Sequence, residues 1–448
     1  MPGFDNAEEE ALVRVGPGTP SGELFRRYWL PVEASENLQI GDAQHSINGP
    51  RNPLQVRVLG EELVLWRDGS GQAHLMDEHC AHRGTSLYWG RVEPDRIRCL
   101  YHAWAYDGTG QCVEQPAEPP DSTFKNHIRQ QTYPTCEVGG LIFAYMGPPD
   151  KQPCFPRYDI LFRDDGLRIT GKGGYIQGCN VFQALLDNNL DIWHPEFAHN
   201  WFMRREAIVS MHHGIDGRPA SPVRYDRTPW GTRDMVLKDT AQPGVYEYYE
   251  LHTVFPAARC NRNALRWGIP VDDYRTRWFV VEFYEYGPDG KLTPDSERAA
   301  NNRGPTSMTH ATAEPADNWV RDVGAWWNFD HRMRGGVLWE DEVICGTQGT
   351  EARHGLPDWE KWHLGSSDRG VVLQRRVWRE QIERIEQGLD PVGIERDPRK
   401  AADLIRIPAE RIITNWEHGN ALMQMSAEER AASMSSSSGS RVYSLTTR

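Results

Sequence analysis

Hydrophobic and polar residues alternate along the chain from residue 54 onward, with the period of two that is typical of a half-buried β-strand. Val56 and Val58 lie on one side of such a strand, and residues 68–71 (Asp-Gly-Ser-Gly) have the composition of a tight turn. A second hairpin signal covers residues 105–112, which contain two further glycines. This pattern predicts a small antiparallel β domain over residues 40–150.

The pattern changes after a proline-rich stretch at residues 148–156, which predicts a domain boundary. Strand-like alternation of aromatic residues recurs at 246–254 and at 278–286. Apolar residues at helical spacing then occupy 375–388. Residues 151–425 are therefore predicted to form a larger domain that combines an antiparallel sheet with helices, which makes the chain α+β in fold class.

The remaining segments are predicted to be accessory to these two domains. Residues 1–39 are expected to pack on the larger domain, and the amphipathic run 23–31 predicts a short helix stopped by Pro31. Residues 287–315 are rich in polar and turn-forming residues and predict a long loop. The serine-rich end, residues 426–448, predicts a mobile tail.

Composition and charge exclude several classes of protein. The 448 residues contain no window of about twenty apolar residues, so no transmembrane span is expected. The net charge of −13 argues against nucleic-acid binding as the main role. The first ten residues are acidic and lack the pattern of a secretory signal, which predicts a cytoplasmic protein. Six of the eight cysteines have no paired spacing, as expected of buried free thiols in a reducing compartment.

Candidate chemistry begins with two short motifs that each combine a cysteine with a histidine. Cys80 and His82 form a Cys-x-His clip, and Cys99 and His102 form a Cys-x2-His clip sixteen residues later. Two thiolates on one iron and two imidazoles on the other are the ligand set of a Rieske [2Fe–2S] centre. The alternative is a structural zinc site, which also accepts two cysteines and two histidines but usually pairs like with like in each clip.

A second candidate site lies in the stretch from Asn188 to His199. His194, His199 and the carboxylate of Asp191 fall within nine residues, and two histidines with one carboxylate are the ligands of a mononuclear non-haem iron. On an ideal helix, residues five apart are rotated by about 140° and do not share a face, so Pro195 would have to disturb the turn. The alternative is that both histidines are ordinary polar residues on a helix.

The two motifs together resemble the oxygenase (α) subunit of Rieske non-haem iron aromatic-ring hydroxylases, in particular the phthalate dioxygenase-like group. The resemblance extends from about Arg14 to Pro391. It also rests on a late block, which comprises Glu340-Asp341, Gln348-Gly349-Thr350 and His363-Leu364-Gly365-Ser366-Ser367-Asp368-Arg369-Gly370.

The resemblance implies a role for each motif residue. Cys80 and Cys99 bind one iron of the cluster, and His82 and His102 bind the other. His194 and His199 bind the catalytic iron, with Asp341 as third ligand and Glu340 as the alternative. Asp191 is the catalytic residue that bridges the cluster of one subunit to the iron site of its neighbour. The implied fold is a Rieske domain followed by a catalytic domain of the helix-grip type.

Two departures from the group's pattern stand close to these motifs. Ala103 follows the second cluster histidine where the group often has glycine, which puts the geometry of that loop in doubt. Asn188-Asn189 precedes Asp191 where the group more often has Gly-Asp or a similar pair, which removes charge near the iron site.

The implied function is that of a terminal oxygenase in the catabolism of aromatic compounds. It uses O2 and electrons from a separate reductase to hydroxylate an aromatic substrate, with an aromatic carboxylate as one candidate. The alternative on the same scaffold is a monooxygenase or an O- or N-demethylase. Because the chain has no Gly-x-Gly-x-x-Gly signature, NADH is expected to act only through a separate flavin and iron–sulfur reductase, with or without a ferredoxin. The implied assembly is a homotrimer or a pair of stacked trimers.

Aromatic and cationic residues between about 183 and 290 are the candidates for a substrate pocket. The aromatic candidates are Phe182, Trp193, Phe197, Trp201, Phe202 and Phe255. The cationic candidates for a substrate carboxylate are Arg204, Arg205, Arg224, Arg233 and Arg266.

Overall fold

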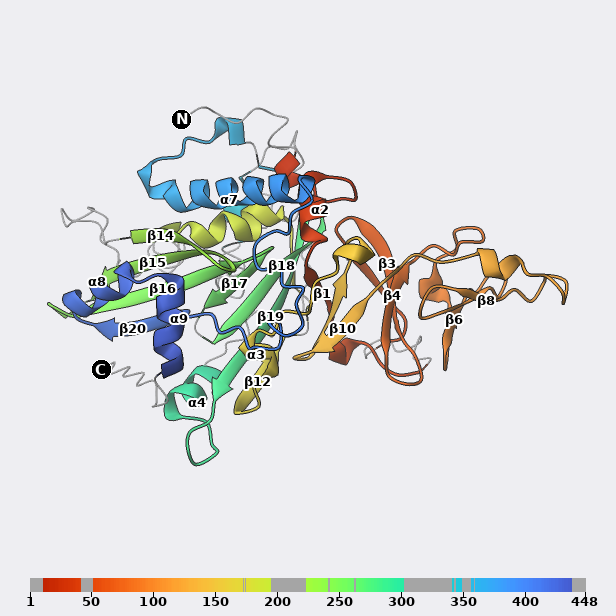
Figure 1. Ribbon diagram of the computed structural model, residues 1–448, viewed down its shortest axis with the longest axis horizontal. Helices are drawn as coiled ribbons and strands as arrows, with labels where there is room; N and C mark the ends of the chain where they lie inside the picture. Colours follow the sequence, from red (N-terminus) through yellow and green to blue (C-terminus); the bar gives the residue numbers. More distant parts are fainter. Residues whose placement is uncertain are drawn as a thin grey trace, which may run out of the picture.

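The computed structural model describes residues 11–41, 51–171, 173, 175–194, 223–240, 242–261, 263–301, 341, 344–348, 356–357 and 359–436. The described chain is elongated, with a small β lobe at one end and a large sheet covered by helices at the other (Figure 1).

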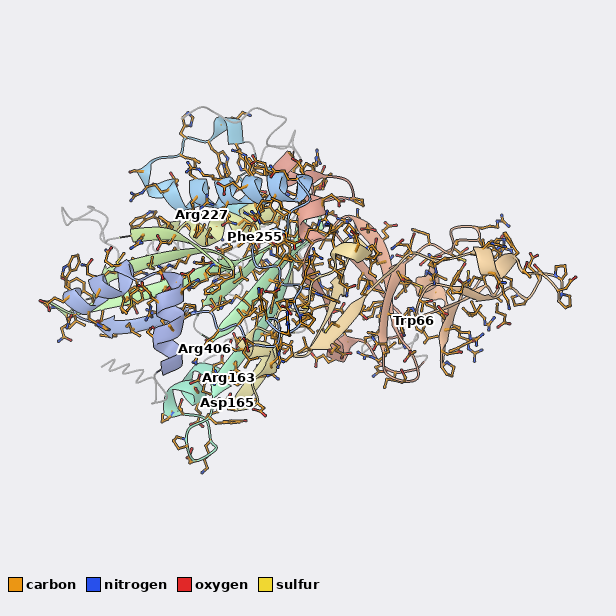
Figure 2. The ribbon with its side chains drawn as sticks, viewed as in Figure 1. Trp66, Arg163, Asp165, Arg227, Phe255 and Arg406 are labelled. Atoms are coloured by element: carbon orange, nitrogen blue, oxygen red, sulfur yellow. The ribbon has the colours of Figure 1, made fainter. Side chains whose placement is uncertain are left out.

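The small lobe consists of two four-stranded antiparallel sheets built from short strands. The first sheet has the order β2-β3-β4-β9 and contains β2 (Leu54–Val58), β3 (Glu61–Arg67), β4 (Ala73–Asp77) and β9 (Thr132–Tyr133). The second has the order β5-β6-β7-β8 and contains β5 (Arg91–Glu93), β6 (Arg96–Arg98), β7 (Ala105–Asp107) and β8 (Cys112–Glu114). Trp66 and Tyr106 are fully buried between them, and Trp66 is labelled in Figure 2. The predicted antiparallel strands and hairpins of this region are confirmed.

A three-stranded sheet lies between the small lobe and the large sheet. It contains β1 (Trp29–Ala34), β10 (Thr135–Val138) and β11 (Leu141–Tyr145), in the order β1-β11-β10. The predicted helix over 23–31 is wrong for most of its length, because the helix α2 spans Pro20–Phe25 and Pro31 lies inside β1. Strand β1 is an edge strand with a register shift after Pro31, and a proline is tolerated at such a position because no ladder hydrogen bond is lost there.

The large sheet has nine antiparallel strands and forms the framework of the second half of the chain. Its main path is β12-β19-β18-β17-β16-β15-β14, while β13 pairs with β19 and β20 pairs with β16. The strands are β12 (Gly166–Thr170), β13 (Tyr175–Gln177), β14 (Val223–Thr228), β15 (Gly231–Asp239), β16 (Tyr246–Val254), β17 (Ala258–Asn261), β18 (Ala264–Asp272), β19 (Arg275–Glu285) and β20 (Glu410–Thr414). The strands predicted at 246–254 and 278–286 are β16 and most of β19, so the α+β fold class is confirmed.

Helices cover both faces of this sheet. The longest, α7 (Arg369–Glu386), runs along one face, and α8 (Trp416–Gln424) and α9 (Ala427–Ser436) lie together near the far edge (Figure 1). Two shorter helices are α3 (Asp159–Phe162) and α4 (Pro294–Asn301). Short helical turns occupy η1 (Ser35–Asn37), η2 (Leu87–Trp89), η3 (Phe124–His127), η4 (Pro149–Lys151), η5 (Phe182–Leu186), η6 (Asn188–Leu190), η10 (Trp359–Lys361) and η11 (Ser366–Asp368).

One helix in this half of the chain was predicted from the sequence, and two lie in segments predicted to be a loop and a tail. The helix expected at 375–388 is α7, and Gly388 after its end has a left-handed backbone (φ 78°) as a C-terminal glycine should. The polar loop expected at 287–315 contains α4, and the tail expected at 426–448 contains α9. Helix α9 is ordered by tertiary contacts, since Arg430 is buried against Glu250. Residues 302–315 and 437–448 lie outside the described residues.

Among the described residues, the longest helices are too polar or too short to cross a bilayer.

Candidate metal sites

The two Cys/His clips lie next to each other at the outer end of the small lobe. The ring centroids of His82 and His102 are 4.6 Å apart, and the Cys80 and Cys99 thiols are within hydrogen-bonding range of each other. The thiols are buried, at 2% and 4% exposure, whereas both imidazoles are half-buried. The four residues of the two clips therefore lie side by side, with sulfur on the inside and nitrogen on the outside.

The two clips share one backbone conformation. The N–H of Cys80 donates to the Thr85 carbonyl (3.0 Å) and the N–H of Gly84 donates back to the Cys80 carbonyl (2.8 Å). In the second clip the N–H of Cys99 donates to the Trp104 carbonyl (2.8 Å) and that of Ala103 donates back to the Cys99 carbonyl (3.1 Å). Each loop thus wraps around its cysteine in the same way, which aims both thiols at one point.

Hydrogen bonds in the lobe prepare the Cys80 thiol for metal binding, whereas the hydrogen bond with Cys80 and burial raise the pKa of Cys99 well above its usual value. The hydrogen bond with Cys99 is the main cause that lowers the pKa of Cys80, to about 6, and it outweighs burial, which acts in the opposite direction. The Oη atom of Tyr106 lies 3.2 Å from Sγ of Cys80 and lowers that pKa further. A thiolate is the form of cysteine that binds metal, so these contacts favour ligation.

The imidazoles are held by aromatic packing. His82 stacks on Trp104, with ring centroids 4.3 Å apart and an interplanar angle of 11°. Nδ1 of His102 is buried and has no hydrogen-bond partner. A buried ring nitrogen without a partner fits a bound group that would supply the missing contact. Two thiols and two imidazoles together are the donor set of a Rieske [2Fe–2S] cluster.

The second candidate site is carried by an irregular helical segment beneath α7. The turn η5 is a π-helix, and η6 that follows it is a tight 3₁₀ turn. The chain leaves helical geometry at Asp191, whose φ and ψ are −88° and 93°. His194 is therefore not on a continuous helix with the preceding turns. Residues 195–199, which separate the two histidines, lie outside the described residues.

His194 lies between two carboxylates that contact opposite edges of its ring. Nδ1 is 2.9 Å from the Asp191 carbonyl and 3.5 Å from Oδ2 of Asp191, while Nε2 is 3.5 Å from Oδ1 of Asp341. Burial alone lowers the pKa of His194, but the two carboxylates raise it to about 10. A concentration of negative charge around a buried imidazole fits a divalent cation, and ligand atoms about 2 Å from one ion lie at such separations.

The remaining predicted ligands are only partly covered by the structure. His199, the proposed second histidine, and Glu340, the alternative to Asp341, lie outside the described residues. Within the described ranges, no three His, Cys, Asp or Glu side chains are arranged to hold one metal ion by themselves.

The sheet presents a polar face toward the iron segment. Strand register places Tyr225, Asp234, Arg259 and Arg266 on one face, which is also the face of Val236, packed against Ile192. Arg259 is paired with Asp234 at 2.6 Å. Directly opposite Arg259 in the sheet, Arg266 has a buried Nε without a hydrogen-bond partner, and it forms no ion pair with another described residue.

Four of the other predicted pocket residues have structural roles. Phe182 and Phe255 pack on Trp378 in the core, at centroid distances of 5.3 and 5.2 Å. Arg233 is fully buried between Glu250 and Asp226 on the opposite face of the sheet, and Arg224 is paired with Asp226. Phe197, Trp201, Phe202, Arg204 and Arg205 lie outside the described residues.

Sequence reasoning missed three side chains that shape the sites. Tyr106 and Trp104 contact cluster ligands, and Arg375 forms a buried ion pair with Asp187, four residues before Asp191. The aromatic residues directly after the second clip were the available signal for the first two. No local signal pairs Arg375 with Asp187, because they are far apart in sequence.

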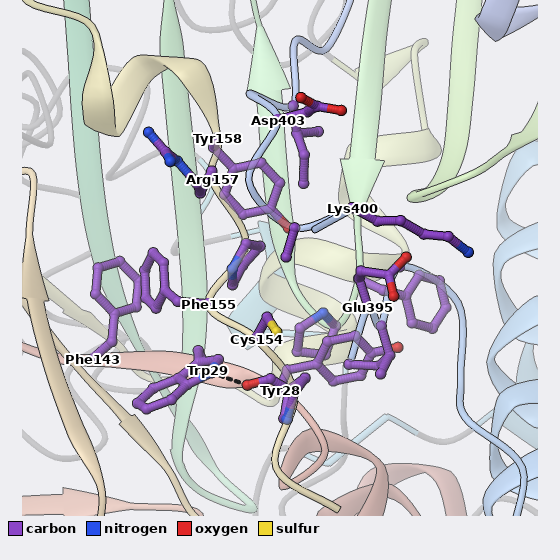
Figure 3. Close-up of a pocket in the computed structure, with 18 of the residues that line it drawn as sticks. Tyr28, Trp29, Phe143, Cys154, Phe155, Arg157, Tyr158, Glu395, Lys400 and Asp403 are labelled. Atoms are coloured by element: carbon purple, nitrogen blue, oxygen red, sulfur yellow. Dashed lines mark hydrogen bonds between the residues drawn. The ribbon is translucent and has the colours of Figure 1, made fainter. Parts of the chain in front are cut away.

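A cavity of about 220 Å³, lined largely by aromatic side chains, shares no residue with the two candidate metal sites. Figure 3 shows the residues that line it. Its walls include Trp29, Phe143, Phe155 and Tyr158, and it is bordered by the segment 393–405. Trp267 in its wall neighbours Arg266 in strand β18 and therefore points to the opposite face of the sheet from the iron segment. The cavity contains none of the predicted metal ligands.

Comparisons with known proteins agree with this arrangement. Residues 29–134 match the family model of the Rieske [2Fe-2S] domain. The chain is 31% identical to the 5,5'-dehydrodivanillate O-demethylase oxygenase subunit of Sphingobium sp. over 430 residues, which cover 94% of this chain and 89% of that protein. It is 41% identical over 389 residues to the tert-butanol monooxygenase / tert-amyl alcohol desaturase oxygenase subunit of Aquincola tertiaricarbonis, covering 83% of this chain and 76% of that protein.

Among solved structures, NdmA of Pseudomonas putida CBB5 (a mutant with theobromine) superposes with a TM-score of 0.53 at 19% identity, over 84% of this chain and 99% of that chain. At this identity the likeness supports the fold alone.

A Rieske domain joined to a large antiparallel sheet defines the class of Rieske oxygenase subunits. The chain belongs to the family of Rieske non-haem iron oxygenases, as an oxygenase (α) subunit, and it is an oxidoreductase. The resemblance stated from the sequence is confirmed, and the zinc alternative for the two clips is set aside.

Proposed function

We propose that this chain is a terminal oxygenase that hydroxylates a small organic substrate, most simply an aromatic one, at a mononuclear iron. In this proposal Cys80, His82, Cys99 and His102 hold the cluster. The observation that carries the proposal is the position of His194, with Nε2 3.5 Å from the Asp341 carboxylate, in a chain that has a Rieske domain. His199 and Asp341 are the proposed second and third iron ligands.

An iron bound there would supply the site at which O2 is activated. The chain's own residues would hold and orient that site. The Asp191 carbonyl accepts a hydrogen bond from Nδ1–H of His194, which sets the ring orientation and turns Nε2 toward the Asp341 carboxylate. The Asp191 carboxylate is in turn held by the N–H groups of Trp193 (3.0 Å) and His194 (3.3 Å).

Electrons are proposed to reach this iron from the cluster of a neighbouring subunit in a homotrimer or in stacked trimers. The small lobe (proposed domain 40–150) extends away from the large sheet of the proposed catalytic domain 151–425 (Figure 1). The Asp191 side chain is 36% exposed in the single chain, which leaves it accessible to His102 of another copy. Asp191→Asn is expected to retain both metal centres and to slow electron transfer to the iron strongly, measured by single-turnover oxidation of the reduced cluster. Loss of iron instead would make Asp191 a ligand.

The electron donor is proposed to be a separate flavin and iron–sulfur reductase that uses NADH, with or without a ferredoxin. No dinucleotide-binding signature occurs in the sequence, so NADH would act through that partner. All eight cysteines are free thiols, which suits a reducing compartment such as the cytoplasm.

The substrate class is proposed from the sheet face beneath the iron segment. Arg266 lies on that face, and its charge has no carboxylate partner among the described residues. This favours a substrate with an acidic group. An aromatic carboxylate is therefore the first candidate. A monooxygenase or an O-demethylase acting on the same scaffold is the second, because one relative is named an O-demethylase and another a tert-butanol monooxygenase.

The test is reconstitution with a reductase, NADH and three groups of compounds: aromatic acids, aryl methyl ethers and tertiary alcohols. We expect NADH-coupled oxygen uptake, with 18O from 18O2 in the product, for at least one group. Arg266→Met is expected to raise KM for an acid about tenfold or more, since an ion pair in a dry site is lost, while its effect on a neutral substrate stays small. Full turnover by His194→Ala would overturn the iron-site assignment.

A further inference from the structure

The last part of the late block, residues 363–370, has no role in the ligand sets above. In the structure it forms the turn that starts α7. The Gly365 N–H donates to Oδ2 of Asp368 at 2.6 Å, and the helix begins at Arg369. Helix α7 then passes directly over the segment that carries Asp191 and His194 (Figure 1).

Arg375 joins α7 to that segment by a buried, two-pronged ion pair. Its Nε lies 3.2 Å from Oδ1 of Asp187 and its Nη2 lies 2.5 Å from Oδ2. The guanidinium also stacks over the rings of Trp359 (4.0 Å) and Trp362 (4.8 Å). Because Arg375 is only 1% exposed and Asp187 5%, this pair is shielded from solvent and its geometry is specific.

Asp187 passes this restraint to the proposed iron site through its backbone. Its carbonyl oxygen accepts hydrogen bonds from the N–H groups of Leu190 and Asp191, both at 3.2 Å. The side chain of Asp187 is thus anchored to the helix, while its main chain sets where Asp191 leaves the turn. His194 follows three residues later and contacts Asp191 by its ring.

Gly370 brings the helix close to the same turn. A Cβ atom at this position would lie 2.4 Å from Cε1 of Tyr225 and 2.7 Å from the carbonyl oxygen of Leu190. The residue is helical, so glycine is required here for close approach and not for an unusual backbone angle. The helix itself is tied to the sheet, since the Thr232 hydroxyl donates to Oε1 of Gln374 at 2.8 Å.

We propose that Gly370, Arg375 and Asp187 are positioning residues, which hold the Asp191–His194 turn at the distance from the sheet that metal binding and electron entry require. The inference rests on the proposed function and adds a role for α7 and the block that starts it. Without the ion pair the turn would lose its buried anchor, and Asp191 and His194 would move together.

Metal affinity provides a readout that does not depend on turnover. The mononuclear site is emptied with a chelator, the cluster is kept, and Co²⁺ is titrated while its d–d absorption is followed. We expect Arg375→Met, Asp187→Asn and Gly370→Ala each to weaken Co²⁺ binding roughly 10- to 100-fold, as changes in residues that orient metal ligands do. The EPR signal of the reduced cluster should be unchanged, and kcat should fall more than KM rises.

Two controls separate positioning from general stability. Arg227→Met removes another paired arginine, whose partner Glu380 lies on α7. The Arg227 side chain is 50% exposed, and the residue is labelled in Figure 2. Gly365→Ala changes a glycine of the same block whose added Cβ would meet nothing closer than 3.7 Å. Both should leave Co²⁺ affinity within about twofold of the parent protein, because neither touches the turn.

A paired replacement decides the outcome even where single variants fold poorly. Arg375→Met with Asp187→Leu removes both charges, which should restore the melting temperature because no buried charge is left unpaired. Co²⁺ affinity should nevertheless stay low. Recovery of both the melting temperature and Co²⁺ affinity in the double variant would overturn the proposal. Normal Co²⁺ affinity in Arg375→Lys and Gly370→Ala, despite a lower melting temperature, would overturn it as well. If His194→Ala leaves Co²⁺ binding intact, the iron-site assignment itself fails, which is a distinct result.

Discussion

Gly84 and Ala103 occupy equivalent positions, each four residues after the cysteine of its clip. Both have left-handed backbones, with φ of 74° and 59°. The absence of glycine after His102 raised a question about this loop. The structure answers it, because Ala103 adopts the conformation that glycine would have and the loop keeps its shape. For an alanine this backbone region is strained by roughly 1–2 kcal/mol.

Ala103→Gly should therefore stabilise the small lobe. We expect a gain of roughly 0.5–1 kcal/mol, since relief of the strain exceeds the added entropy of glycine in the unfolded chain. Thermal unfolding followed by the visible absorption of the cluster measures the lobe alone. As a control, Ala105→Gly in strand β7 should destabilise the lobe, because Ala105 is fully buried in a regular strand. A loss of stability in Ala103→Gly would contradict the strain argument.

The hydroxyl of Tyr106 should tune the potential of the cluster. It lies 3.2 Å from Sγ of Cys80, and a hydrogen bond to a ligand sulfur favours the more electron-rich, reduced state. Tyr106→Phe should lower the reduction potential by about 40 mV, which corresponds to about 1 kcal/mol for one electron. A redox titration monitored by EPR tests this, and an unchanged potential would mean that the hydroxyl does not donate to the sulfur.

At the scale of elements, α7 holds together parts of the chain that are far apart in sequence. Trp378 on this helix is fully buried and packs on Phe25 from α2, Phe182 from η5 and Phe255 at the end of β16. Its indole N–H donates to Oγ of Ser21 at 2.8 Å. The N-terminal segment, the turn before the iron segment and the sheet thus share one anchor.

Removing this anchor should be costly. Trp378→Ala is expected to lower the free energy of unfolding by roughly 3–5 kcal/mol, because a large cavity opens among three aromatic rings. Trp378→Phe keeps most of the packing and should cost less, about 1–2 kcal/mol, including the lost hydrogen bond to Ser21. Chemical denaturation followed by far-UV circular dichroism measures both. Equal effects of the two variants would show that packing volume is not the main contribution.

At the scale of the whole molecule, the cluster end of the small lobe exposes apolar residues. Leu100 and Tyr101, beside His102, are 71% and 55% exposed, and Trp89 and Phe124 are 62% and 47% exposed. Large exposed apolar side chains around a redox centre are typical of a surface that another protein covers. A neighbouring subunit, with its Asp191 presented to His102, is the occupant that the proposed trimer supplies.

Mixed oligomers test electron transfer between subunits. Cys80→Ser removes the cluster in one chain and His194→Ala removes the iron in another, so neither variant alone should turn over. When both are co-expressed with different tags and isolated as hetero-oligomers, activity should return to about a third of the parent value in a trimer, since every mixed ring of three has one interface that pairs an intact iron with a neighbour's intact cluster. Inactive mixed oligomers, with metal contents at half of the parent value, would contradict the inter-subunit route.

The local features of this protein follow from its sequence. The clips around Cys80 and Cys99, the turn at 68–71 and the strand at 278–286 depend on residues close together in the chain, so spacing and alternation were enough to predict them. Pro31 was misread because its strand is stabilised by distant β11, and 427–436 was misread because Arg430 is buried by strands far away in sequence.

By itself, the sequence determined the family, the two ligand motifs and the fold class, because ligand chemistry and periodicity are encoded in neighbouring residues. The pairing of Arg375 with Asp187, and the position of Arg266 rather than Arg233 on the face toward the iron segment, became visible only in the folded chain. These contacts join residues on different elements, so they depend on strand register and helix packing. Such relations are set by the burial of the whole core and have no signature in any short stretch of chain.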